Sequence, residues 1–323
     1  MTEASRAIDV HAHVYPAVYL DRLEEIGVDP ATTAIAHDLG ADSTDADMSA
    51  RLKLMDQAGV ETQVLAVTPQ CPSGVEPGPS LAAARWINDE YARLVRRHDG
   101  RFLAYGALPL PHVDASLTEI DRIVDEFGFV GVSLPALLPG GTSLADWRFD
   151  PVWAALDEHS AIVNLHATGS GAMSRLLVDH GLVWVNGAPV EDAICVLHLL
   201  KADIPRRFPR VRFHVAHLAG DLPFLAQRLE DNFEDWGAFP ESPLTALRRM
   251  WFDAANFHEP SLAMTVETLG AQQIMAGSDH PYFQGEKYVR AFDYIRTSRL
   301  SPTEIDAVLT GNANDLYRVV TKD

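Results

Sequence analysis

Cysteine is nearly absent from this sequence. Only Cys71 and Cys195 occur among 323 residues, which excludes a disulfide framework and a cysteine-rich metal site. Positive charge is also scarce, since 26 Lys and Arg face 45 Asp and Glu and give a formal net charge of -19. Because an acidic surface repels nucleic acid and anionic membranes, we expect neither as a partner and interpret the charge as an aid to solubility.

A basic, apolar leader and long apolar runs are missing as well. The chain enters an apolar stretch at residues 8–14, and we find no later run of transmembrane length. We therefore expect a cytoplasmic protein with no membrane association. The hydrophobic content of 47% suffices for a sizeable core, and 323 residues is a length that a single α/β barrel commonly reaches.

Short apolar runs alternate with amphipathic stretches along the whole chain. The predicted strands are residues 8–14, 63–68, 101–108, 129–134, 161–166, 211–217, 251–255 and 273–277. Helical spacing of apolar residues lies between them, as at 81–97 and 115–127. This α/β alternation predicts a (β/α)8 TIM barrel as a single domain over residues 1–323, with a doubly wound open sheet as the structural alternative. Residues 16–47 lack steady periodicity, and we interpret them as an insertion over the barrel mouth.

Polar side chains stand where several predicted strands end. His11 and His13 follow the first strand on one face, and His166, His217 and Asp279 follow the fifth, sixth and eighth. The carboxyl ends of barrel strands meet at one face, so these groups should converge. A His-x-His pair alone is as often structural as metal-binding. Several histidines and a carboxylate around an open position are the ligands of a catalytic zinc or a similar divalent ion.

At this point the sequence resembles a known family. It is similar to the metal-dependent amidohydrolase superfamily, and more closely to its branch of aminocarboxymuconate semialdehyde decarboxylase and related aromatic-acid decarboxylases. The resemblance extends over nearly the whole chain. It rests on IDVHAHV at 8–14, LKLMDQAGVETQVLAVTP at 52–69, RFLAYGALPL at 101–110, NLHA at 164–167, FPRVRFHVAHLAGDLPF at 208–224, AGSDHPY at 276–282 and GNANDLY at 311–317.

The resemblance implies a role for each of the polar groups. One divalent ion, zinc or alternatively manganese, would be bound by His11, His13, His166 and Asp279. His217 would be the general acid/base beside the metal, with Asp279 also serving catalysis. His214 alternates away from His217 along the strand, so we expect it to face the helices and be structural.

Three further residues are candidates for substrate binding. Trp184, in WVNGAP, matches an active-site tryptophan of the branch, although plain packing would also explain it. Arg228 matches an arginine that reaches the neighbouring subunit's site, which implies a homodimer or a higher homo-oligomer. A surface ion pair with nearby carboxylates is the simpler alternative for Arg228. His280 follows the last strand and is expected to contact the substrate.

Departures from the family pattern narrow the expectations. Binuclear members bridge two metals with a carboxylated lysine near the fourth strand, but the four lysines here lie elsewhere, so one metal is expected. Residues 32–47 hold no arginine to grip a substrate carboxylate. His166 is followed by Ala-Thr-Gly rather than Pro, and His217 by Leu-Ala-Gly rather than glycines. These changes point to a substrate other than the best-known one of the branch.

The predicted function is a metal-dependent, non-oxidative decarboxylation of an aromatic or unsaturated small-molecule carboxylic acid. The metal would act as Lewis acid and template, and His217 would move the required proton. The alternatives are hydrolysis of a lactone, an amide or a carbon–carbon bond, and hydration of a double bond. A barrel that binds a metabolite without turnover would require a vestigial metal site, and no expected ligand is missing.

Overall fold

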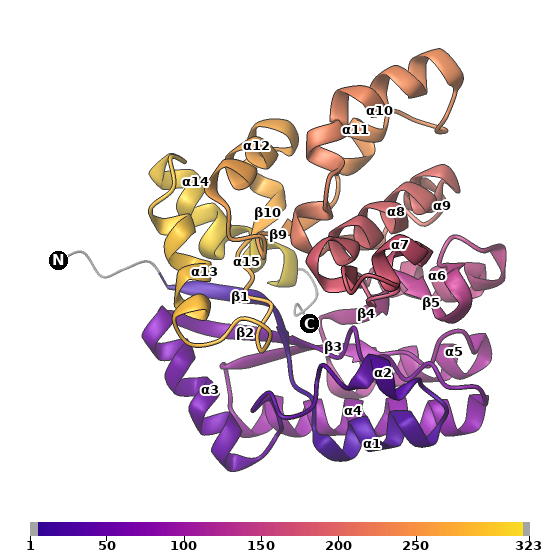
Figure 1. Ribbon diagram of the computed structural model, residues 1–323, viewed down its shortest axis with the longest axis vertical. Coiled ribbons are helices and arrows are strands. Elements are labelled where there is room, and N and C mark those ends of the chain that lie inside the picture. The colour runs from indigo at the N-terminus through magenta and orange to yellow at the C-terminus, as the bar shows by residue number, and fades with distance from the viewer. Residues whose placement is uncertain (1–5, 319–323) are drawn as a thin grey trace.

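The computed structural model describes residues 6–318 and is organised around one parallel sheet of eight strands (Figure 1). The strands are β1 (Ala7–His13), β2 (Val60–Ala66), β3 (Phe102–Ala107), β4 (Gly131–Pro135), β7 (Ile162–His166), β8 (Arg212–Val215), β9 (Trp251–Asp253) and β10 (Ile274–Met275). They follow one another in the sheet in chain order and overlap the eight predicted strands. A short antiparallel pair, β5 (Leu137–Leu138) and β6 (Thr142–Ser143), lies apart from this sheet.

The last strand returns to the first and closes the barrel. The N–H of Val10 donates to the carbonyl of Ala276 at 2.9 Å, and the N–H of Asp279 donates to the carbonyl of His11 at 2.9 Å. A parallel bridge between Ala12 and His280 extends this contact past the end of β10. The predicted (β/α)8 TIM barrel is therefore confirmed, and the open sheet was the wrong alternative.

Helices connect the strands and surround them (Figure 1). The longer ones are α1 (Ala17–Glu25), α3 (Asp45–Ala58), α4 (Pro77–Arg97), α5 (Val113–Asp121), α6 (Asp150–Glu158), α8 (Ala188–Lys201), α10 (Leu222–Trp236), α12 (Glu259–Leu269) and α13 (Glu286–Arg296). The shorter ones are α2 (Pro30–Thr33), α7 (Arg175–Val178), α9 (Ile204–Arg207), α11 (Pro243–Leu247), α14 (Pro302–Asp306) and α15 (Asn312–Arg318). Single turns of tighter or wider helix include η1 (Arg122–Phe127), η5 (Val183–Gly187), η6 (His217–Ala219) and η8 (Ala307–Gly311).

Strand alternation divides the buried apolar residues into two layers. Val163, Leu165, Phe213 and Val215 belong to the large cluster between the sheet and the helices. A smaller cluster, which includes Val64, Tyr105 and Ile162 of the strands and Leu316 of α15, fills the barrel interior. Since neighbours along a strand face opposite sides, Asn164, His166 and His214 point into the barrel. The prediction that His214 faces the helices is therefore wrong.

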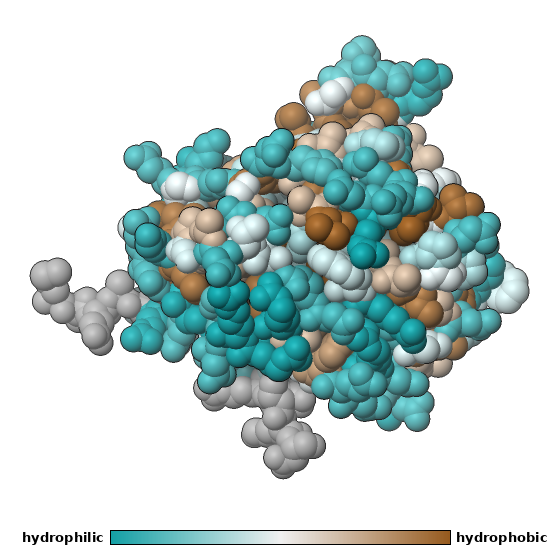
Figure 2. Space-filling model, turned by 90° about the horizontal axis from the view of Figure 1, so that it is seen from below, coloured by the Kyte–Doolittle hydropathy of each residue, from teal (hydrophilic) through white to brown (hydrophobic). Residues whose placement is uncertain are grey.

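One helical stretch departs from what we expected of the sequence. Val183–Lys201, which comprises η5 and α8, has the length and mean hydropathy, 1.2, of a membrane span. Half of that window is buried within the protein, and α8 turns Glu191 and Asp192 inward to fully buried positions. We interpret it as a core helix of the barrel, since core helices share this length and composition. Figure 2 shows one face of the molecule as mainly hydrophilic, with its apolar residues in small separate groups.

Candidate active site

Four imidazoles meet at the carboxyl ends of the strands. His11 and His13 come from β1, His166 from the end of β7, and His217 from the turn after β8. The ring centroid of His11 lies 5.1 Å from that of His13, 4.9 Å from His166 and 5.0 Å from His217. All four are buried, so the cluster lies at the base of the mouth rather than on the surface.

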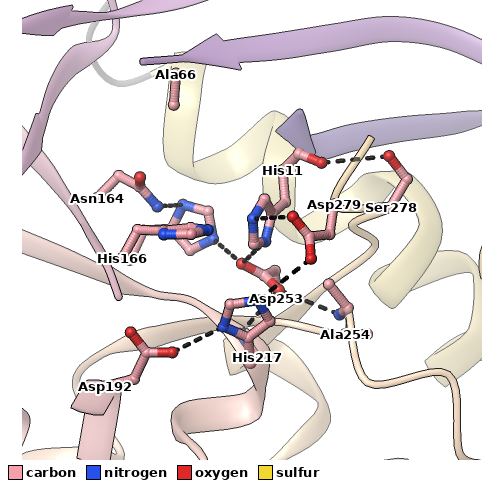
Figure 3. Close-up of polar contacts among 12 residues, drawn as sticks. His11, Ala66, Asn164, His166, Asp192, His217, Asp253, Ala254, Ser278 and Asp279 are labelled. Carbon is pink, nitrogen blue, oxygen red and sulfur yellow. Dashed lines mark hydrogen bonds and ion pairs between the residues drawn. The ribbon is translucent and has the colours of Figure 1, made fainter. Parts of the chain in front are cut away.

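The Asp279 carboxylate faces these rings with both of its oxygen atoms (Figure 3). Its Oδ1 lies 3.4 Å from Nε2 of His11 and 3.3 Å from Nε2 of His13, and its Oδ2 lies 3.6 Å from Nε2 of His217. Asp279 adopts a φ of 55°, a conformation that non-glycine residues keep only when their surroundings impose it. The backbone is thus held in a strained form that aims the carboxylate at the histidines.

The other ring nitrogen of each histidine is held by an acceptor. Nδ1 of His11 lies 2.9 Å from Asp253 Oδ2, and Nδ1 of His217 lies 2.7 Å from Asp192 Oδ2. Nδ1 of His13 and of His166 face backbone carbonyls at 3.1 and 2.6 Å. With Nδ1 protonated and donating, Nε2 of His11, His13 and His166 would present its lone pair to an ion at the centre of the cluster. This arrangement is typical of metal-ligating histidines.

The central nitrogens lack the partners that buried polar atoms normally have. Nε2 of His11 and Nε2 of His166 are buried and form no hydrogen bond within the protein. Burial, with the neighbouring imidazoles, lowers the pKa of His166 well below its ordinary value, so this ring is neutral. Burial would also lower the pKa of His11, but the charges of Asp253 and Asp279 raise it to about 10. The centre therefore favours positive charge, which a divalent ion would supply, and its donor set fits such an ion.

The geometry groups the ligand atoms slightly differently from the prediction. The ligand atoms of His11, His166, His217 and Asp279 all lie within 4.8 Å of one another, whereas His13 falls outside this set although it faces Asp279. This is the one such cluster of histidine, cysteine and carboxylate groups in residues 6–318. The structure thus places all five predicted residues together.

His217 reaches the site by a route that strand alternation did not predict. The alternation that set His217 opposite His214 would give His217 the face of Phe213 and Val215, but those side chains point outward. The strand ends at Val215, and His217, Leu218 and Ala219 follow with φ of 53°, 55° and 57°. Such backbone costs roughly 1–3 kcal/mol per residue and clusters at functional sites. The turn swings the imidazole over the barrel mouth.

Asp192 determines the electrostatic state of His217. Its carboxylate comes from α8, is fully buried and lies on the side of the ring opposite Asp279 (Figure 3). Burial would lower the pKa of His217, but the hydrogen bonds and charges of Asp192 and Asp279 raise it well above its ordinary value. These contacts favour the protonated ring, which is the form that can donate a proton. We did not identify Asp192 from the sequence, where it is one of two adjacent acidic residues in a mainly apolar helix.

Asp253, also missed in the sequence, lies under the cluster at the end of β9. Its Oδ2 faces both His11 Nδ1, at 2.9 Å, and His214 Nε2, at 3.2 Å. Its Oδ1 accepts the N–H groups of His217 and Ala255, both at 3.1 Å. The sequence did carry a signal, since Asp253 follows an apolar strand just as His166 and Asp279 do.

A second polar layer supports β1 from the helix side. Asp9 accepts hydrogen bonds from the side chains of Gln63 and Ser278 at 2.8 and 2.6 Å. The buried guanidinium of Arg51 in α3 donates to Gln63 at 2.7 Å and to the carbonyl of His13 at 2.6 Å. The contacts of Asp9 and of the His13 carbonyl join β1 to neighbouring elements, and the Arg51–Gln63 bond links two of those elements, so the layer supports the backbone that carries His11 and His13.

A cavity of about 520 Å³ opens above the cluster and includes His166, His217 and Asp279 in its wall. Aromatic side chains form much of the remainder. Trp184 of η5 stacks on Tyr282 with ring centroids 6.4 Å apart, and Phe257 packs on Phe283 at 4.6 Å. Ile35 and Leu39 of the insertion close one side. Among the residues described, no lysine or arginine lines this cavity.

Trp184 thus lies where the resemblance implied, while two other predicted substrate residues do not line the cavity. His280 is buried edge-on against Tyr288, with ring centroids 5.3 Å apart, and is not part of the cavity wall. Arg228 is exposed on α10 and lies outside the cavity of its own chain. Glu230 accepts a hydrogen bond from Ser242 and Asp231 from Gln227, and no ion pair joins Arg228 to either carboxylate in the part of the chain described.

A second cavity, of about 510 Å³, lies beside the first on the mouth of the barrel. It is lined by the loops after β2, β3, β4 and β7 and by residues 27–29 of the insertion. Residues of the loops 70–79 and 139–146 line this second cavity and not the one above the histidines.

Comparison with known proteins agrees with this geometry. The family profile described as amidohydrolase matches residues 8–319. A 2-amino-3-carboxymuconate-6-semialdehyde decarboxylase of Dictyostelium discoideum is 24% identical over 302 residues, covering 87% of this chain and 83% of the relative. A gamma-resorcylate decarboxylase of Rhizobium radiobacter is 26% identical over 284 residues, covering 82% and 84%.

Solved structures share the fold. A dihydroxybenzoic acid decarboxylase from Polaromonas sp. JS666, with bound manganese and the inhibitor 2-nitroresorcinol, superimposes with a TM-score of 0.83 at 18% identity. The match covers 99% of this chain and 98% of that one. At this identity the likeness establishes the architecture and not the substrate.

Proposed function

Because this chain belongs to the amidohydrolase family, we propose that it is a metal-dependent, non-oxidative decarboxylase of a small aromatic carboxylic acid. The observation that carries the proposal is the histidine–aspartate cluster at the base of a cavity walled by aromatic rings. The relatives named above are decarboxylases, which favours this reaction over hydrolysis or hydration.

One divalent ion would be held by His11, His13, His166 and Asp279, with His217 beside it as the proton donor. When bound, it would supply Lewis-acid stabilisation of negative charge on the substrate's oxygen atoms. The manganese of the Polaromonas enzyme supports manganese beside zinc as the ion. Loading metal-free protein with each ion in turn, and measuring metal content against activity, would distinguish them.

The chain's own groups divide the remaining work. Trp184 and Tyr282 would orient the aromatic ring of the substrate by stacking, since their planes lie at 19° to one another. His217 would donate its proton to the ring carbon that bears the carboxylate. The bond between that carbon and the carboxylate would then break, CO2 would leave, and the donated proton would remain on the ring carbon. Asp192 would hold the imidazole in the orientation that donates from Nε2.

The test is an assay of metal-loaded protein on gamma-resorcylate, other hydroxybenzoates and unsaturated acids. We expect CO2 release and the decarboxylated phenol by chromatography, with none from an Asp279→Ala protein purified in the same way. Hydrolysis products without CO2 would refute the proposed reaction.

A second copy of the chain completes the proposal. Helix α10 stands out from the barrel beside α11, and its Phe224 and Trp236 are 74% and 76% exposed (Figure 1). Exposed aromatic side chains of this size are typical of surfaces that another protein covers. We infer a homodimer in which α10 brings Arg228 to the partner's cavity. There the Arg228 guanidinium would bind the substrate carboxylate and supply the positive charge that no Lys or Arg of the cavity wall provides.

This arrangement predicts complementation between inactive chains. Arg228→Ala should lose activity while keeping metal, and mixing it with Asp279→Ala should restore part of the activity once subunits exchange. Arg299→Ala, at a surface ion pair with Glu259, is the matched control and should keep full activity. A monomer by light scattering with full activity would rule the arrangement out.

A further inference from the structure

We propose that Asp253 is a positioning residue that ties the metal ligand His11 and the proton donor His217 to one buried carboxylate. The inference rests on the proposed metal site and extends it to a residue outside both the ligand set and the cavity wall. Asp253 is fully buried at the end of β9.

Every hydrogen bond of Asp253 goes to the catalytic cluster or its immediate support. Oδ2 accepts from His11 Nδ1 at 2.9 Å and from His214 Nε2 at 3.2 Å. Oδ1 accepts from the backbone N–H of His217 and of Ala255, each at 3.1 Å. The bond to His11 Nδ1 directs Nε2 of that ring to the metal position. The bond to the His217 N–H anchors the strained turn that carries the His217 ring.

His214 supports Asp253 from the barrel interior. Because its Nε2–H donates to Asp253, its Nδ1 must accept, and Tyr105 Oη and Asn164 Nδ2 lie 3.1 and 3.2 Å from it. The Asn164 amide in turn accepts from the Ser133 hydroxyl at 2.7 Å. This chain of contacts across the barrel interior holds the Asp253 carboxylate against His11.

An amide cannot replace this carboxylate. If the oxygen of Asn took the Oδ2 position, its NH2 group would face the backbone N–H groups of His217 and Ala255. All of these groups are donors, so neither N–H would have an acceptor. In the reverse orientation, the NH2 group would face His11 Nδ1 and His214 Nε2. His11 could then accept only with its proton on Nε2, the nitrogen that must bind the metal.

The experiment measures Mn²⁺ affinity by electron paramagnetic resonance of the free ion, so it needs no substrate. Asp253→Asn should weaken Mn²⁺ binding by about 10- to 100-fold, the usual effect of removing a partner of a ligating histidine. Glu119→Gln is the matched control, since Glu119 is a fully buried carboxylate that contacts Asn88 and Arg122 far from the cluster. Its affinity should equal that of the unmodified protein.

A second variant separates positioning from loss of packing. His214→Leu removes one ring from Asp253 Oδ2 but keeps the bond to His11, so it should lower the melting temperature with a smaller loss of affinity. If His214→Leu loses as much Mn²⁺ affinity as Asp253→Asn, positioning by the carboxylate is overturned.

Should Asp253→Asn fail to fold, nitrogen NMR of the zinc-loaded unmodified protein gives the answer directly. The proposal requires His11 to be protonated at Nδ1 and metal-bound at Nε2, and the reverse would refute it. Unmodified protein that binds no metal would overturn the metal site and this inference together. Equal Mn²⁺ affinity of Asp253→Asn and unmodified protein would overturn this inference alone.

Discussion

Replacing Asp192 by Asn tests the state of His217 more sharply than removing the histidine itself. The substitution keeps the size of the side chain and takes away one negative charge, 2.7 Å from Nδ1 of the ring. Asp192 contacts no other residue of the metal cluster, so the effect should be confined to His217. We expect the pKa of His217 to fall, because burial then acts against the charged ring with only Asp279 in opposition.

The size of the effect follows from the lost contact. A hydrogen bond between charged groups contributes about 1.5–3 kcal/mol. If that energy orients and protonates His217 in the transition state, its loss lowers turnover by roughly 10- to 150-fold at 1.36 kcal/mol per tenfold change. The rate should also become more sensitive to alkaline pH, because a His217 of lower pKa gives up its proton earlier.

The assay pairs turnover with metal content. Elemental analysis should find as much metal in the Asp192→Asn protein as in the unmodified protein. The rate of CO2 release from the substrate identified in the assay should be lower by the factor given above. Unchanged turnover would show that Asp192 does not activate His217. Loss of metal together with activity would show that His217 is a ligand, as its place within 4.8 Å of the other ligand atoms allows.

Three further substitutions test the rest of the site. His217→Ala should keep its metal and lose on the order of 10²–10⁴-fold in turnover, the usual worth of proton-transfer catalysis; purification without metal would make His217 a ligand. Asp279→Ala should lose metal and turnover but retain its melting temperature, because the barrel core lies below the site; bound metal by elemental analysis would contradict the predicted ligand set. Gly277→Ala would place a methyl group 2.9 Å from Cβ of His11, closer than two such carbons approach, so Mn²⁺ binding should weaken; unchanged affinity in a titration would show that β1 can move away.

The barrel could be predicted from the sequence because its pattern is local. Each strand is a short run rich in Val, Ile, Leu and Phe, such as residues 162–166, and each helix repeats its apolar face at the spacing of a helical turn. Polar side chains that interrupt these runs at their ends, such as His11, His166 and Asp279, therefore had to gather at one face of a closed barrel.

Only the tertiary structure decided which way several of these side chains point. The side chains of β8 do alternate between its two faces, as the sequence predicts. Which set points outward was decided by the packing of Phe213 and Val215 against the helices, and this turned His214 into the barrel. His217 entered the site through a turn of positive φ that no periodicity encodes. Asp192 and Asp253 meet their histidines from 25 and 242 positions away in the chain. The place of Asp253 at the end of an apolar strand is visible in the sequence, but the histidine that each carboxylate contacts is not, because pairing over such separations depends on the tertiary structure.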